Sequence, residues 1–147
     1  MNADPRTLGW LGRALTHELG AVQQYLAQAV LADLWGEQAL AQQLRREADE
    51  ELQHAQRLME RLLLLGVAPA AGPLAPARLG RQVDELLRAN RQLELEAVRL
   101  YQEALMHARR VRDVDGEALM QALLQDEIAH LAAVETLLVN VNGAHQS

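Results

Sequence analysis

Apolar side chains recur at alternating steps of three and four residues along four long stretches of this sequence. This spacing places them on one face of an α-helix, and most of the intervening residues favour helices. Asp4 and Pro5 suit the start of the first helix, because a carboxylate caps a first turn and proline fits within it. We expect helices over about residues 5–35, ended by Gly36, 37–65 and 82–111, and a fourth that follows a turn at 113–116 and ends near Gly143.

The connection between the second and third of these helices is much longer than the other two. Residues 66–80 are rich in Pro, Gly and Ala and lack the helical spacing. Short, long and short connections predict two antiparallel hairpins joined by a crossover. The predicted fold is therefore all-α, a four-helix bundle formed by a single domain over residues 1–147. Only residues 142–147 remain after the fourth helix, so we expect a packed fifth helix to be absent.

Charge and composition exclude several classes of function. The chain carries a net charge of −6, which argues against nucleic acid binding and favours the binding of cations. The absence of Cys excludes disulfides, thiolate metal sites and thiol catalysis. The first residues lack the order of a signal peptide, and the longest uncharged stretch, 62–77, contains three prolines and is no membrane span. We expect a cytoplasmic protein without a membrane partner.

The polar residues that interrupt the apolar faces follow one pattern. The second and fourth helices each carry a Glu-x-x-His motif, and the first and third each carry one central Glu. A shift of 76 positions, as in 94 − 18 = 76, places the polar pattern of the first half on that of the second and also pairs the only two tyrosines. The pairs are Glu18 with Glu94, Tyr25 with Tyr101, Glu51 with Glu127 and His54 with His130.

This set of carboxylates and imidazoles predicts a metal site with two ions. Residues three apart lie on one helical face, roughly 5–6 Å apart at Cβ, so each Glu-x-x-His offers two ligands to one side of a metal. Four carboxylates balance two divalent ions, and without cations their burial would be costly. One Glu-x-x-His alone is more often part of a solvated face, but two such motifs with two further Glu describe di-iron and di-manganese bundles. The predicted ligands, also the catalytic residues, are Glu18, Glu51, His54, Glu94, Glu127 and His130.

Other polar residues near this set have weaker claims. Tyr25 and Tyr101 lie on the same faces, where they either pack in the core, donate a hydrogen bond to a ligand carboxylate or act as electron donors; we favour support of a ligand. Glu47 lies one turn before Glu51, where an acid could help to deliver iron. Glu50 and Asp126 directly precede ligand glutamates and could support the ligands, as could Glu47, but we expect all three to face solvent. We expect His17, His107 and His145 to be ordinary surface or packing residues.

The chain resembles the bacterioferritins, a ferritin-like family, over about residues 6–138. The resemblance lies in Glu18 with residues 19–25, Trp35-Gly36, and residues 50–55, 93–96 and 126–130. All six metal ligands of that family fall on matching residues. The resemblance implies a ferritin-like bundle and a ferroxidase subunit that oxidises Fe(II) with O₂ or H₂O₂ at two iron ions, with manganese as a possible substitute. It also implies storage of ferric mineral in a cage of twenty-four subunits.

Two departures from the family pattern affect the expected partners. Family members that bind haem b use a Met directly after the second-helix Glu, where this chain has Leu52, so we do not expect haem binding through this chain. Some members combine a ferroxidase subunit with a second, haem-binding subunit, and this chain resembles the former. The family usually adds a fifth helix that lines a pore of the cage. The fifth helix that we expect to be absent here would affect the cage but not a dimer built on the long helices. Since most subunit contacts in that family come from the bundle itself, we expect a homo-oligomer, at least a dimer, and favour the cage.

Three functions are compatible with these ligands. In the favoured one, each Glu-x-x-His anchors one iron, and Glu18 and Glu94 complete the site as terminal or bridging carboxylates. Dioxygen or hydrogen peroxide then takes two electrons from the pair of irons. The alternatives are a non-storage dimeric di-iron or di-manganese oxidase or peroxidase, and a structural subunit of a mixed cage.

Overall fold

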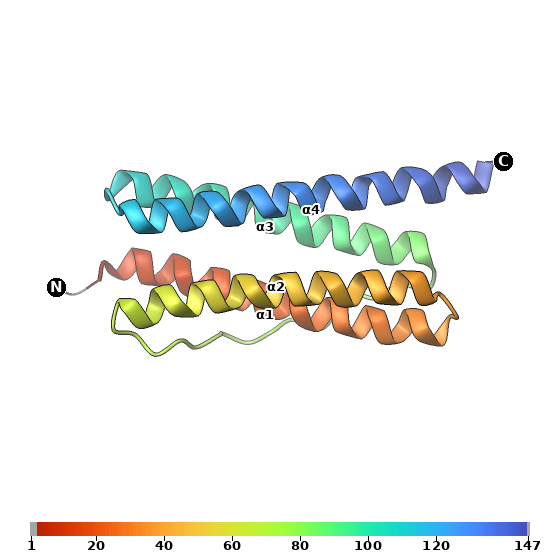
Figure 1. Cartoon of the computed structure of the whole chain (residues 1–147), viewed down its shortest axis with the longest axis horizontal. Coiled ribbons are helices and arrows are strands. Elements are labelled where there is room, and N and C mark those ends of the chain that lie inside the picture. Colours follow the sequence, from red (N-terminus) through yellow and green to blue (C-terminus); the bar gives the residue numbers. More distant parts are fainter. Residues whose placement is uncertain (1–2, 147) are drawn as a thin grey trace.

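Four long helices make up nearly all of the part of the chain that the computed structural model describes, residues 3–146. They are α1 (Pro5–Leu34), α2 (Gln38–Leu64), α3 (Val83–Arg110) and α4 (Val114–Gln146). Those residues contain no strand. α1 pairs along its length with α2, and α3 with α4, so the molecule consists of two helical hairpins side by side (Figure 1). The predicted all-α four-helix bundle is confirmed.

The first three helices end in the same hydrogen-bonded motif. At the end of α1, the N–H of Gly36 donates to the carbonyl of Asp33 at 3.0 Å, and the N–H of Glu37 donates to the carbonyl of Ala32 at 2.9 Å. This arrangement needs a left-handed residue after the last turn. The three residues in that position are Gly36 with φ 78°, Gly66 with φ 80° and Arg112 with φ 58°. Gly36 therefore ends the first helix as predicted.

Both ends of α4 differ from the prediction. The helix begins at Val114, so Gly116, which we had placed in the preceding turn, lies in its first turn. The carboxylate of Asp113 accepts a hydrogen bond from the N–H of Gly116 at 3.0 Å and caps the helix. A Cβ on residue 116 would lie 2.0 Å from that carboxylate. Glycine at this position therefore leaves room for the capping carboxylate and does not interrupt the helix. At the other end, α4 continues through Gly143 to Gln146.

The long connection between the hairpins is held against α1 by polar contacts. The N–H of Gly72 donates to Thr16 Oγ1 at 2.9 Å, and Gln28 Nε2 donates to the carbonyl of Arg78 at 2.8 Å. Gln28 is fully buried, so this bond satisfies one of its polar groups inside the protein. The predicted crossover thus runs along the outside of the bundle, where these hydrogen bonds hold it against α1 (Figure 1).

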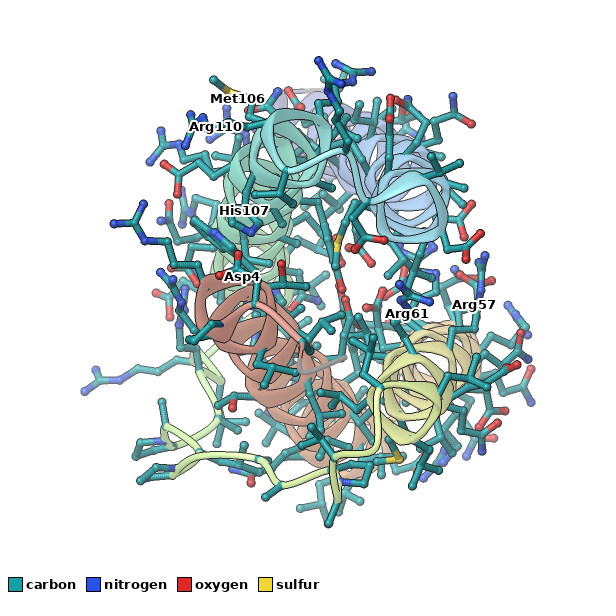
Figure 2. All side chains as sticks on the ribbon, turned by 90° about the vertical axis from the view of Figure 1, so that its left-hand side faces the viewer. Asp4, Arg57, Arg61, Met106, His107 and Arg110 are labelled. Atoms are coloured by element: carbon teal, nitrogen blue, oxygen red, sulfur yellow. The ribbon has the colours of Figure 1, made fainter. Side chains whose placement is uncertain are left out.

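Two hydrophobic clusters fill the bundle, one toward each end. Viewed along the helices, side chains from the four helices point into the space between the ribbons (Figure 2). Leu15 and Leu58 belong to one cluster, and Leu44 and Leu86 to the other. A band of polar side chains crosses the bundle between them. None of the described helices is long and apolar enough to cross a membrane.

Candidate metal centre

The six predicted ligands meet in the middle of the bundle, between the two hydrophobic clusters. All four glutamates are at most 1% exposed. Their donor atoms and those of the histidines form two groups, in each of which the atoms lie within 4.8 Å of one another. The groups are Glu18, Glu51, His54 and Glu127, and Glu51, Glu94, Glu127 and His130. Glu51 and Glu127 belong to both groups and would bridge two ions bound there, whereas Glu18 and Glu94 would each bind one.

The two Glu-x-x-His motifs do not form separate halves of this centre. Glu51 Oε1 lies 2.8 Å from His130 Nδ1, whereas Glu51 Oε2 lies 3.6 Å from His54 Nδ1 in its own motif. Likewise Glu127 Oε1 lies 2.9 Å from His54 Nδ1. Each of these two glutamates therefore approaches the histidine of the opposite hairpin more closely than its own. Each group of donors nevertheless contains one complete motif together with the glutamate of the other, so the assignment of one ion to each motif stays a prediction.

Each of the six residues has one buried atom with no partner in hydrogen-bond geometry, although two of these atoms, Glu51 Oε1 and His130 Nδ1, lie 2.8 Å apart. Among the described side chains, eight buried polar atoms lack such a partner, and six of them are one carboxylate oxygen of each glutamate and the Nδ1 of each histidine. Unsatisfied buried polar atoms are rare in proteins because each costs about 1–3 kcal/mol. Hard oxygen donors and imidazole nitrogens at this spacing suit a pair of divalent iron or manganese ions. The residues present therefore fit the metal that the fold implies.

The outer nitrogens of both histidines are held by carboxylates. Asp126 Oδ2 lies 2.9 Å from His54 Nε2, and Glu50 Oε2 lies 2.6 Å from His130 Nε2. Such contacts fix the ring so that Nδ1 faces the centre. We had expected Glu50 and Asp126 to face solvent, and both are indeed about half exposed. The sequence contained a signal for their second role, since 126 − 50 = 76 is the shift that relates the ligands.

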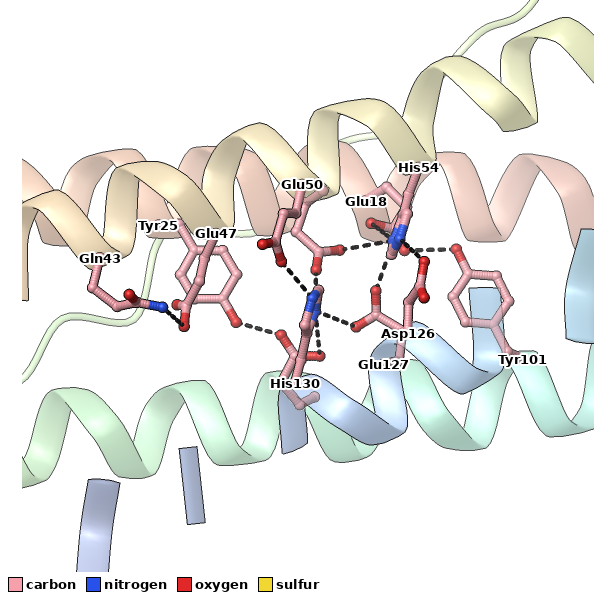
Figure 3. A network of polar contacts seen from close by, with 12 residues as sticks. Glu18, Tyr25, Gln43, Glu47, Glu50, His54, Tyr101, Asp126, Glu127 and His130 are labelled. Carbon is pink, nitrogen blue, oxygen red and sulfur yellow. Dashed lines mark hydrogen bonds and ion pairs between the residues drawn. The ribbon is translucent and has the colours of Figure 1, made fainter. Parts of the chain in front are cut away.

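The two tyrosines support the glutamates that belong to one group only. Tyr101 Oη donates to Glu18 Oε1 at 2.6 Å, and Tyr25 Oη donates to Glu94 Oε1 (Figure 3). Both bonds run between α1 and α3, so each tyrosine holds a carboxylate of the opposite hairpin. This is the hydrogen bond to a ligand carboxylate that the sequence analysis favoured. Burial, followed by the nearby carboxylate charge, raises the pKa of both phenols, which keeps them protonated as donors.

Burial and mutual repulsion determine the protonation of the metal-free centre. Burial raises the pKa of Glu18 and of Glu94 well above the ordinary value, and the neighbouring glutamates raise it further. Burial opposes ionisation of Glu127 as well, but hydrogen bonds from its neighbours outweigh it and lower its pKa. For His130, burial lowers the pKa, yet contacts with Glu127 and Glu51 raise it to about 12. The metal-free centre thus holds protons where cations would bind.

Glu47 and the remaining histidines lie around this centre. Glu47 is half-buried, contrary to the expected solvent-facing position; Gln43 Nε2 donates to it at 3.3 Å, and burial raises its pKa. His17 is half-buried, and burial lowers its pKa. His107 packs where α1 begins, with its Nε2 2.9 Å from Thr7 Oγ1. The side chain of His145 lies outside the described side chains, residues 3–143.

Comparisons with known proteins agree with this geometry. Residues 10–144 match the ferritin-like domain family. The bacterioferritin of Streptomyces coelicolor is 36% identical over 138 residues, which are 94% of this chain and 83% of the relative. That of Brucella melitensis is 34% identical, covering 94% of this chain and 86% of the relative. The chain belongs to the bacterioferritin family.

A solved bacterioferritin supports the assignment in three dimensions. The Rhodobacter capsulatus protein, described as having a metal-free dinuclear site and a haem iron, superposes with a TM-score of 0.93 at 31% identity. The superposition covers 97% of this chain and 89% of the other. The predicted family is therefore confirmed. Within this family member, Leu52 lies on α2 and is partly exposed.

Proposed function

We propose that this bacterioferritin family member oxidises Fe(II) to Fe(III) at its central site and serves in iron storage and detoxification. One observation carries the proposal: six buried donor atoms, one from each predicted ligand, converge in two groups that share Glu51 and Glu127. In this assignment Glu18 and His54 complete one iron position, and Glu94 and His130 complete the other. Similarity to bacterioferritins over nearly the whole chain favours storage over a non-storage oxidase.

The residues of the chain bind and orient, and the metal supplies the electrons. When bound, two Fe(II) ions supply one electron each, so dioxygen leaves as hydrogen peroxide after taking up two protons, or hydrogen peroxide leaves as two waters after taking up two. Asp126 and Glu50 hold the histidine rings with Nδ1 toward the centre. Tyr101 and Tyr25 hold Glu18 and Glu94 in place.

Protons leave the centre when metal enters. The raised pKa values of Glu18 and Glu94 mean that these carboxyls hold protons in the metal-free protein. Two divalent ions replace those protons and bring four positive charges to four carboxylates. Charge balance then allows the site to remain buried, because ion pairing offsets the desolvation of the carboxylates.

The family relationship also supports proposals about assembly and location. Homologous bacterioferritins suggest a cytoplasmic homo-oligomer and a cage of twenty-four subunits. With Leu52 where haem-binding members have Met, haem b would come from a second, haem-binding subunit of a mixed cage.

Light scattering before and after iron loading tests the storage proposal. The full chain, purified without metal, receives Fe(II) anaerobically and is then exposed to air. We expect a particle much larger than a dimer that oxidises and retains far more than two irons per chain. A dimer that stops at two irons per chain would contradict storage and move the function to redox enzymology.

A further inference from the structure

The two iron positions have equivalent ligands but different surroundings. The shift of 76 positions relates every ligand in the centre, yet it pairs Glu47 with Leu123 (47 + 76 = 123) and Gln43 with Leu119 (43 + 76 = 119). Two polar residues in the first hairpin thus correspond to two leucines in the second. Because the ligands of the two positions are equivalent, a functional difference between the positions would arise from neighbouring residues that differ between the two hairpins.

Leu123 lies one turn before Glu127 on α4. It is fully buried and belongs to the hydrophobic cluster that contains Tyr101, the tyrosine that donates to Glu18. Leu119 packs against the same cluster. The ring of His54 is only 6% exposed. The position formed by Glu18 and His54 therefore lies against apolar side chains.

Glu47 lies on the other side, where the centre is more open. The ring of His130 is 19% exposed, three times the value for His54. Glu47 is half-buried one turn before Glu51 on α2, and its carboxylate accepts a hydrogen bond from Gln43 (Figure 3). Glu94 Oε2, buried and without a partner, belongs to this same position. A carboxylate and an unpaired buried oxygen thus occur together on this side.

We propose that the two positions exchange metal at different rates, and that Glu47 is a transient ligand of the Glu94–His130 position. Metal enters and leaves through this position, where Glu47 replaces water as the ion loses its permanent ligands. The Glu18–His54 position exchanges slowly because Leu123 blocks the corresponding route. This inference rests on the proposed function, since it assumes that the six residues bind two ions.

Removal of Co(II) tests the inference without any oxidation reaction. The full chain is loaded with Co(II), whose visible absorption reports its ligands, and is then mixed with excess chelator. We expect two phases of equal amplitude whose rates differ by about tenfold or more. Glu47→Gln should slow the fast phase, and Glu47→Leu, which copies the second hairpin, should slow it to near the rate of the other phase. Glu60→Gln, an exposed change on the same helix, should leave both phases unchanged.

The outcomes separate the inference from the proposed function. Circular dichroism spectra that match the wild type show that each variant is folded. Binding of fewer than two Co(II) ions per wild-type chain would refute the proposed function. Two ions that leave in one phase, or in two phases unaltered by Glu47→Gln, would refute only the unequal exchange.

Discussion

At the scale of single residues, the centre consists of contacts that cross from one hairpin to the other. Each tyrosine, each outer carboxylate and each bridging glutamate contacts a residue of the opposite hairpin. The ligand set therefore exists only when both hairpins are packed together. This arrangement explains why the Glu-x-x-His motifs predicted residues that meet in the structure but did not predict which carboxylates belong to both groups of donors.

Bridging and terminal glutamates should differ in the number of ions lost on substitution. Glu51 is common to both groups of donors, whereas Glu18 belongs to one. We expect Glu51→Gln to abolish tight binding of both Co(II) ions and Glu18→Gln to abolish that of one, measured by calorimetric titration of the metal-free protein. Equal losses in the two variants would contradict the assignment of bridging ligands.

The tyrosines are expected to position carboxylates and not to supply electrons. Tyr101→Phe and Tyr25→Phe each remove a hydrogen bond to a buried carboxylate, which should cost about 1–3 kcal/mol of metal-free stability. The initial rate of Fe(II) oxidation should change only slightly, and by a similar factor in the two variants, because the pseudo-repeat relates the two tyrosine–glutamate hydrogen bonds. A loss of oxidation confined to Tyr25→Phe, measured by stopped-flow absorbance, would instead support its role as an electron donor.

At the scale of helices, the pseudo-repeat fails at one turn. Gly36 ends α1 with φ 78°, and the residue 76 positions later, Arg112, has φ 58°. Side chains other than glycine are disfavoured there because Cβ approaches the following carbonyl. The second hairpin thus carries conformational strain that the first avoids.

Replacing Arg112 with glycine should therefore stabilise the protein. We expect Arg112→Gly to raise the free energy of unfolding by about 1 kcal/mol, measured by urea denaturation of the metal-free chain. Arg99→Gly, an exposed change in the middle of α3, provides the matched control and should lower it by about 1 kcal/mol. Destabilisation by both substitutions would show that the left-handed turn carries no relievable strain.

Helix periodicity and turn residues predicted the elements well, and the errors have physical causes. Gly36 and Gly66 end helices as their conformational freedom suggests. Gly116 misled the prediction because Asp113, three residues earlier, caps the helix and so places this glycine in the first turn. Gly143 continues α4 because an exposed glycine weakens a helix without ending it. Glu50 is exposed as predicted, but nothing local in the sequence shows that His130 approaches it from the other hairpin.

At the scale of the whole molecule, metal binding and folding are linked through protons. In the metal-free protein the pKa values of four groups are raised, those of Glu18, Glu94, His54 and His130. Their contribution to the free energy of unfolding is therefore fully present below the pKa values of the unfolded chain, and it is lost as pH rises toward the pKa values of the folded protein. Glu127, with a lowered pKa, acts in the opposite sense but only below the pKa of the unfolded chain. Between about pH 5.5 and pH 7.5, unfolded histidines lose protons that the folded protein retains.

The stability of the metal-free protein should therefore fall across that interval. The metal-loaded protein, in which ions replace the protons, should lose little stability over the same interval. The difference between the melting temperatures of the metal-loaded and metal-free protein should therefore widen as pH rises. Differential scanning calorimetry with and without Co(II) measures this difference. A difference that stays constant or narrows toward pH 7.5 would contradict the protonated state assigned to the centre.

The stoichiometry of Fe(II) oxidation tests the central claim most directly. Metal-free protein is titrated with Fe(II) under anaerobic conditions, and the rapid oxidation on admitting air is measured at each ratio. We predict a fast phase whose amplitude saturates at two irons per chain in the wild type and is absent in Glu51→Gln. A fast phase that fails to saturate at two, or that persists in Glu51→Gln, would contradict a di-iron centre shared by Glu51 and Glu127.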